Sequence, residues 1–139
     1  MQNIDLRWKQ RFSNFKKALL QLNEIVHQEK LNKFEEQGLI QAFGYTYELA
    51  WKTLQDYLRY KRYNEIAGPR PVIEQSFQDG IITNGEEWMK MFKDRNLTSH
   101  TYDEIFAKEI SRKIKDNYFT LLDDLGKKLD SLATTSISL

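Results

Sequence analysis

Cysteine is absent from this chain of 139 residues. Its absence excludes a disulfide framework, a thiolate zinc site and a cysteine nucleophile, and it fits a reducing compartment. Proline and glycine are also scarce, with two and six residues respectively. Because these two residues interrupt helices, and because runs of β-branched residues are few, the composition favours long helices over strands.

Long hydrophobic runs and an excess of one charge are missing as well. No apolar segment approaches the ~18 residues that a membrane span needs, and residues 1–8 lack the apolar core of a signal peptide. We therefore expect a cytoplasmic protein with no membrane association. The net charge at pH 7 is +1. A protein of this charge does not bind nucleic acid through bulk electrostatics, so any contact with RNA requires a local cleft.

Apolar side chains recur at helical spacing along most of the chain, which predicts an all-α fold of about five helices in an antiparallel up-and-down bundle. The predicted bounds are about 3–28, 32–60, 71–80, 84–95 and 103–131, with N-caps at Asn32, Asn84 and Asp103. The apolar face of the second helix is wide, which indicates a central position. We expect a single domain over residues 3–132. Residues 133–139 have no anchoring pattern and are expected to form a frayed tail.

The segment from Arg95 to Tyr102 concentrates the chemistry of the chain, with the sequence Arg-Asn-Leu-Thr-Ser-His-Thr-Tyr. His100 is one of two histidines in the protein, and histidine is the side chain best able to exchange protons near neutral pH. Arg95 keeps its charge and presents a planar fork of donors that suits phosphate oxygens. A phosphate-binding cation beside a proton-transfer group is what cleavage or transfer at a phosphodiester requires.

Helical spacing alone does not bring these two side chains together. On an unbroken helix, positions five apart diverge by roughly 140°, so an ordinary surface cation and a solvated ring are the alternative interpretation. Arg95 and His100 converge only if the helix ends or bends between them, or if a second subunit places a symmetric copy alongside. The hydroxyl residues Thr98, Ser99 and Thr101 favour a helix end at this point.

Other candidate residues leave two interpretations open. Glu48 lies beside the apolar band of the second helix, where its carboxylate pairs with Lys52 or forms an ion pair near the cleft. Basic residues alternate with aromatic ones over residues 56–63, which either contact RNA or a nucleotide or form a solvated helix end. Lys52 and Arg59 are the candidate contacts to a nucleotide or RNA. His27 has no metal-ligating residue spaced with it, and we expect neither a metal nor a cofactor.

Several motifs, taken in order, give the chain a family resemblance. The run Arg95-Asn96-x3-His100-x-Tyr102 resembles the Arg-x4-His-x-Tyr form of the motif of HEPN domains, as in the HepT toxins. These toxins are also known as nucleotidyltransferase substrate-binding proteins. Three stretches that precede this motif also match the family, in the same order along the chain, at residues 43–52, 71–82 and 88–91. The resemblance covers roughly residues 5–130.

This resemblance implies a HEPN-like fold with a four-helix-bundle core, and a homodimer in which two Arg–His motifs meet across a two-fold cleft. It also implies a metal-independent RNase, in which a 2′-hydroxyl attacks the adjacent phosphorus and a 2′,3′-cyclic phosphate forms. His100 would then act as general base or acid, and Arg95 would stabilise the charge on the phosphorane oxygens. Asn96 would orient the phosphate or the imidazole ring.

The resemblance further implies a separately encoded minimal nucleotidyltransferase as the partner. In the toxin–antitoxin pairs of this family, that enzyme transfers AMP to the motif tyrosine, here Tyr102, which would occlude the cleft. A second interpretation is a non-catalytic substrate-binding subunit of a two-component nucleotidyltransferase. A third is a purely structural bundle, for which substitutions of Arg95, His100 and Tyr102 would all be silent.

Overall fold

The structure is a computed structural model that describes the backbone of residues 2–138 and the side chains of residues 6–134. In this range it is all-α, with no strand. Its helices are α1 (Gln2–Val26), α2 (Lys33–Tyr60), α3 (Pro69–Gln78), α4 (Gly85–Asn96), α5 (Glu104–Lys113) and α6 (Phe119–Ser138), with a 3-10 turn at Thr98–His100 and a π-helical turn at Ile114–Tyr118. Because the π turn joins α5 to α6 directly, the chain forms five continuous helical segments in these residues, as predicted.

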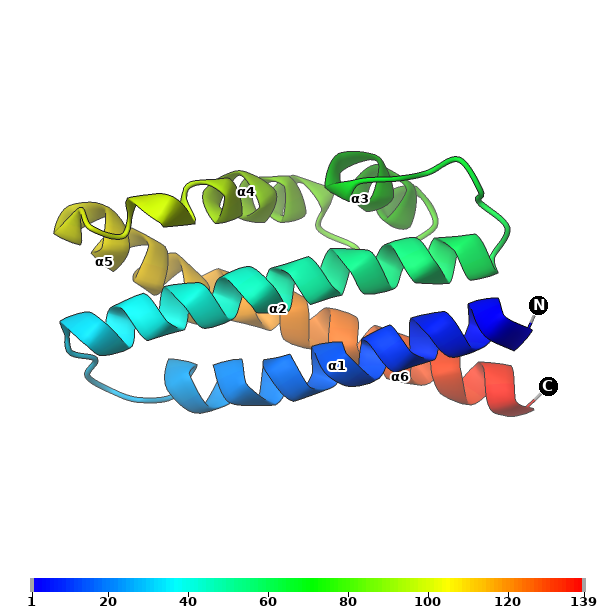
Figure 1. Ribbon diagram of the computed structural model, residues 1–139, viewed down its shortest axis with the longest axis horizontal. Helices are drawn as coiled ribbons and strands as arrows, with labels where there is room; N and C mark the ends of the chain where they lie inside the picture. Colours follow the sequence, from blue (N-terminus) through cyan, green and yellow to red (C-terminus); the bar gives the residue numbers. More distant parts are fainter. Residues whose placement is uncertain (1, 139) are drawn as a thin grey trace.

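Helix α2 occupies the centre of the bundle, as its wide apolar face predicted. It contacts α1, α3, α4, α5 and α6. Figure 1 shows α1 on one side of α2, α3 and α4 on the other, and α5 and α6 running lengthwise behind them. The interior is one hydrophobic cluster to which every helix contributes. Its largest fully buried side chains are Trp8, Trp88, Tyr47, Phe15, Phe43, Leu22, Leu39, Ile40, Leu54, Leu58, Ile73 and Met91.

Two of the three predicted N-caps are confirmed. Asn32 forms a complete capping box with Glu35, because each side chain bonds to the backbone N–H of the other. The Asp103 carboxylate accepts hydrogen bonds from the backbone N–H groups at the start of α5. Asn84 does precede α4, but its side chain makes no capping bond, so this prediction is wrong in its chemistry.

The π-helical turn at Ile114–Tyr118 is a feature that the apolar spacing did not predict. A π turn inserts one extra residue into the helix and rotates everything that follows it. Tyr118 is the last residue of this turn and is buried in the core. Helix α6 continues to Ser138, beyond its predicted end near residue 131. The side chains of residues 135–138 lie outside the described residues, so the frayed tail remains a prediction.

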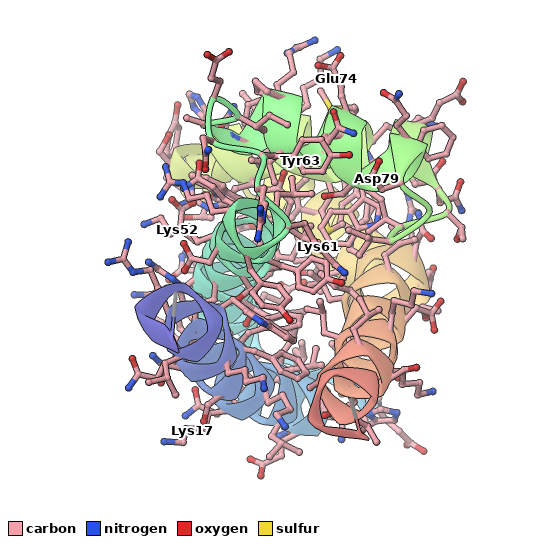
Figure 2. The ribbon with its side chains drawn as sticks, turned by 90° about the vertical axis from the view of Figure 1, so that its right-hand side faces the viewer. Lys17, Lys52, Lys61, Tyr63, Glu74 and Asp79 are labelled. Carbon is pink, nitrogen blue, oxygen red and sulfur yellow. The ribbon has the colours of Figure 1, made fainter. Side chains whose placement is uncertain are left out.

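The segment between α2 and α3 is held against the bundle by local bonds. Helix α2 ends in a Schellman-type cap, in which the N–H of Tyr63 bonds to the carbonyl of Leu58 and the N–H of Arg62 to that of Arg59. Arg62 occupies the left-handed position, with φ 77°. The hydroxyl of Tyr63 donates to Asp79 at the end of α3. Figure 2 shows this pair at the end of the bundle that faces the viewer, where the chain passes from α2 to α3.

A partly buried ion pair joins α1 to α2. Arg11 Nε donates to Asp56 Oδ2 at 2.9 Å, and only 2% of the Asp56 side chain is exposed. A buried carboxylate is costly without a partner, so this contact fixes the pairing of the two longest helices. None of the described helices is long and apolar enough to cross a membrane.

Candidate functional site

The helix end predicted between Arg95 and His100 is present. Helix α4 ends at Asn96, and Thr98–His100 form a 3-10 turn that leads to α5. The hydroxyl of Thr98 donates to the carbonyl of Arg95 at 2.9 Å, which satisfies one of the free carbonyls at the end of the helix. The hydroxyl residues therefore end the helix, as the sequence indicated.

The Arg95 side chain lies across α2 and is about one-third exposed. Its Nε donates to the carbonyl of Gly44 at 3.1 Å, and its Nη2 lies 3.7 Å from Glu48 Oε2. A Cβ on Gly44 would lie 3.4 Å from Arg95 Nε, so the glycine leaves room for the guanidinium. One hydrogen bond and one ion pair thus anchor the guanidinium on α2, and the fork carries further N–H groups beyond these two contacts.

Both interpretations of Glu48 hold at once. Its carboxylate lies 3.6 Å from the ammonium of Lys52, four residues along α2, and 3.7 Å from the guanidinium of Arg95. The two oxygens of Glu48 are divided between these cations, with Oε1 toward Lys52 and Oε2 toward Arg95. Glu48 is therefore the link between the motif arginine and the candidate contact Lys52.

The imidazole of His100 lies on the surface. Its Nδ1 is 3.4 Å from the hydroxyl of Tyr102, and its ring meets Phe106 edge to face with centroids 6.2 Å apart. Tyr102 itself is 76% exposed. An exposed imidazole next to an exposed phenol leaves both groups open to a substrate or to a modifying enzyme.

Within one chain, the arginine and the histidine of the motif do not meet. Arg95 bonds to α2, whereas His100 contacts Tyr102 and Phe106, and no hydrogen bond or ring contact joins the two in the described residues. Asn96 is exposed and lines a groove between α3 and α4, and no hydrogen bond joins it to the imidazole in the part of the chain that the structure describes. Of the two ways in which Arg95 and His100 could converge, the helix end is present, and it does not by itself bring the two side chains into direct contact.

Exposed apolar side chains surround this end of the bundle. Phe34 and Ile105 are 77% and 76% exposed, and Leu97 is 41% exposed. A Lys33–Glu104 ion pair at 3.5 Å brings the starts of α2 and α5 together, so Phe34 and Ile105 lie on neighbouring elements. Large apolar side chains clustered on a surface mark interaction sites more often than isolated ones do.

A polar network fixes the last turn of α4 from behind. The hydroxyl of Tyr118 makes a short hydrogen bond to Asp94, and Lys113 lies 3.4 Å from the same carboxylate oxygen. Two turns earlier on α4, Asn117 donates to Glu87 at 2.6 Å. Burial, reinforced by the bond to Asp94, raises the pKa of Tyr118 well above its ordinary value. The π turn therefore bonds to α4 at Glu87 and at Asp94, the residue that precedes Arg95.

Tyr47 lies on the core side of the same region. Its ring packs against Trp88 and Phe43, and its hydroxyl is buried with no hydrogen-bond partner among the described residues. Burial raises the pKa of this phenol strongly, and the nearby charge of Glu48 adds to the effect. Tyr47 belongs to the wide apolar face of the second helix, but no sequence pattern indicates that its hydroxyl is unsatisfied.

The remaining candidates lie further from the motif. Arg59 is half-buried in the last turn of α2, seven residues beyond Lys52, and Figure 2 shows Lys52 projecting outward from α2. The ammonium of Lys61 lies over the rings of Tyr57 and Tyr60, so the basic and aromatic residues of this segment largely contact one another. The described residues contain no group of three or more His, Cys, Asp or Glu that could hold a metal ion.

Sequence reasoning missed two features of the site. The groove between α3 and α4 is one, and the contact of Tyr118 with Asp94 is the other. Aromatic residues on both short helices were the available signal for the groove. No sequence signal indicated the contact of Asp94 with Tyr118, because the two residues are distant in sequence and the π turn determines where Tyr118 lies.

An all-α bundle that carries an Arg-x4-His-x-Tyr motif where a helix ends defines a protein of the HepT type within the HEPN class. The chain belongs to the family described as nucleotidyltransferase substrate binding protein like, whose model matches residues 10–131.

The chain is similar to known proteins, among them a curated protein and a solved structure. A Haemophilus influenzae protein named probable ribonuclease HepT is 30% identical over 83 residues, so the match spans 57% of this chain and 57% of that relative. A crystal structure of a protein from Thermus thermophilus has a TM-score of 0.76 and 37% sequence identity. That match covers 82% of this chain and 98% of the other, so the bundle is shared with a solved structure over most of its length.

Proposed function

We propose that this protein is a metal-independent endoribonuclease whose active site forms between two copies of the chain. Arg95 binds the scissile phosphate and stabilises charge on the phosphorane oxygens, and His100 transfers protons. The 2′-hydroxyl loses its proton and attacks the adjacent phosphorus, and the bond from phosphorus to the 5′-oxygen breaks. The leaving oxygen takes up a proton, which leaves a 2′,3′-cyclic phosphate.

The observation that carries this proposal is that the arginine and the histidine of the motif bond to different partners within one chain and not to each other in the described residues. Arg95 is pinned to α2 with part of its fork free, whereas His100 stands exposed beyond the end of α4. A two-fold dimer supplies the missing proximity, because it places the histidine of one copy near the arginine of the other. The exposed side chains of Phe34, Leu97 and Ile105 give such a dimer an apolar surface to bury.

The partner in this proposal is a minimal nucleotidyltransferase, which the family description supports. With ATP, it would join the hydroxyl oxygen of Tyr102 to the α-phosphorus. The bond to the β-phosphate would break, pyrophosphate would leave, and the phenol would lose its proton. The exposure of Tyr102 and its position beside His100 suit this role, because a phosphate added there would stand beside the imidazole, face the Arg95 of the other copy across the proposed cleft and block RNA.

The test of catalysis is cleavage of single-stranded RNA by the purified protein in the presence of a chelator. Arg95→Ala and His100→Ala should each lower the rate by about 100-fold or more. His27→Ala is the matched control, since His27 is the other histidine and its ring bonds to a backbone carbonyl on α1. Wild-type cleavage that His100→Ala leaves unchanged would contradict the assignment.

The test of the switch uses the nucleotidyltransferase and ATP. Mass spectrometry should find one AMP on the wild-type chain and none on Tyr102→Phe, and the modified chain should no longer cleave RNA. An adduct on another residue would refute the role of Tyr102.

A second candidate function is a substrate-binding subunit without catalysis, which the family description favours. It predicts that the wild-type chain leaves RNA intact at every concentration but binds the nucleotidyltransferase and raises its activity. The cleavage assay separates the two candidates.

A further inference from the structure

A groove of about 790 Å³ lies between α3 and α4 and has no role in the chemistry described above. Cavities of a few hundred to a thousand Å³ are typical of sites for small organic groups. One face of α4, from Gly85 to Asn96, forms its floor. At 1.5 Å per residue this face is about 17 Å long, which is enough for several bases stacked about 3.4 Å apart.

Apolar side chains from both helices line the groove. Phe77 of α3 is 51% exposed, and Met89 and Phe92 of α4 are half-buried. The Phe77 ring lies against Gly85, where an added Cβ would come within 3.1 Å of it, so the glycine gives this ring a fixed seat. Aromatic rings held in place are stacking surfaces for nucleobases.

The rim of the groove carries charges of both signs. Arg70 and Lys93 are exposed and form no ion pair within the described residues, whereas Lys90 lies 3.1 Å from Glu87. Glu74 and Glu86 are the carboxylates. Cations at a rim contact backbone phosphates, and carboxylates accept hydrogen bonds from the amino groups of bases. An apolar peptide would leave these carboxylates without partners.

The groove is continuous with the proposed active site through Asn96. Arg95 and Asn96 are consecutive residues, but the arginine turns to α2 and the asparagine lines the groove. In the proposed complex, a strand whose phosphate is bound by Arg95 would extend past Asn96 to the groove-lining rings of Phe92 and Phe77. The carboxamide can both donate and accept, as the edge of a base does.

We infer that the α3–α4 groove is the subsite for the bases of single-stranded RNA that flank the cleaved phosphate. This inference rests on the proposed RNase function and adds to it the element that selects the substrate. Free nucleotides share the same chemistry, so the experiment must distinguish a strand from a mononucleotide.

The experiment measures binding of fluorescent 2′-O-methyl oligonucleotides by anisotropy. These strands have no free 2′-hydroxyl, so they cannot be cleaved and binding is measured apart from catalysis. Phe77→Ala should raise Kd by about 10-fold or more, in line with the loss of one stacked base. Leu20→Ala is the matched control, because Leu20 is 66% exposed on α1, outside the groove. A melting curve for each variant verifies that the bundle is intact.

Three outcomes would overturn the inference. Equal Kd values for wild type and Phe77→Ala would remove the groove from RNA binding. Displacement of the strand by AMP at lower concentration than by a trinucleotide would assign the groove to a free nucleotide. If Phe77→Ala weakens binding to the nucleotidyltransferase but not to RNA, the groove belongs to the interface with that protein. Failure of the RNase proposal itself would be seen in the cleavage assay, where RNA with free 2′-hydroxyls would remain intact.

Discussion

Two buried tyrosines predict opposite effects for the same substitution. The hydroxyl of Tyr118 donates to the carboxylate of Asp94, and hydrogen bonds to charged groups contribute about 1.5–3 kcal/mol. Lys113 remains beside Asp94 in Tyr118→Phe, so the free energy of unfolding should fall by about 2 kcal/mol. The hydroxyl of Tyr47 has no partner in the described residues, so Tyr47→Phe should be neutral or stabilise by up to about 1 kcal/mol.

The same pair predicts how stability depends on alkaline pH. Burial raises the pKa of both phenols above the ordinary value of about 10. Below that value both phenols are neutral in the folded and unfolded chains, so their contribution to stability is fully present. As the pH rises above about 10, the unfolded chain loses protons that the folded chain keeps, and stability falls by up to about 1.4 kcal/mol per pH unit for each tyrosine. Each phenylalanine variant should remove its own share of this slope.

Urea unfolding followed by tryptophan fluorescence measures both effects, near neutral pH and between about pH 9 and pH 11. Each variant is compared at two protein concentrations, because the stability of a dimer depends on concentration. The reasoning is refuted if both variants shift the urea midpoint in the same direction. It is also refuted if the alkaline slope is the same in wild type and in both variants.

Three further comparisons test other parts of the fold and site. Arg11→Ala should lower the free energy of unfolding by about 3 kcal/mol, because it leaves the buried charge of Asp56 unpaired. Asp56→Asn removes that charge and should cost less. Equal urea midpoints for the two variants would contradict this. Arg62→Gly should stabilise by about 0.5–1 kcal/mol, since glycine adopts the left-handed backbone without strain; a lower melting temperature would argue against it. Gly44→Val should displace the motif guanidinium and slow RNA cleavage at least about 10-fold, whereas Gly38→Val, with no atom within 4 Å of its Cβ position, should cleave normally. Equal rates for the two valine variants would remove Gly44 from the site.

Most of the fold was predictable because it depends on local patterns. The apolar spacing predicted the helices, and the capping residues Asn32 and Asp103 indicated where two of them begin. The π turn was not predictable, because its extra residue is stabilised by contacts with α4 rather than by its own sequence. Asn84 failed as a cap because composition indicates which side chains can cap a helix, and only geometry decides whether one does.

The candidate site was predictable in its residues but not in their relations. The helix end after Arg95 followed from the hydroxyl residues, and the pairing of Glu48 with Lys52 followed from their spacing. The bond from Arg95 to Gly44 joins residues far apart in the chain, which no local pattern encodes. Gly44 leaves room for the side chain of this distant arginine.

The most direct measurement is a mixing experiment on the two catalytic substitutions. Arg95→Ala and His100→Ala are purified separately, each inactive, then mixed in equal amounts and allowed to exchange subunits. About half of the dimers then carry one intact arginine facing one intact histidine from the other copy. A site shared between copies predicts that the mixture cleaves RNA faster than either variant alone. A mixture as inactive as its components, with exchange verified by mass spectrometry, would contradict that arrangement.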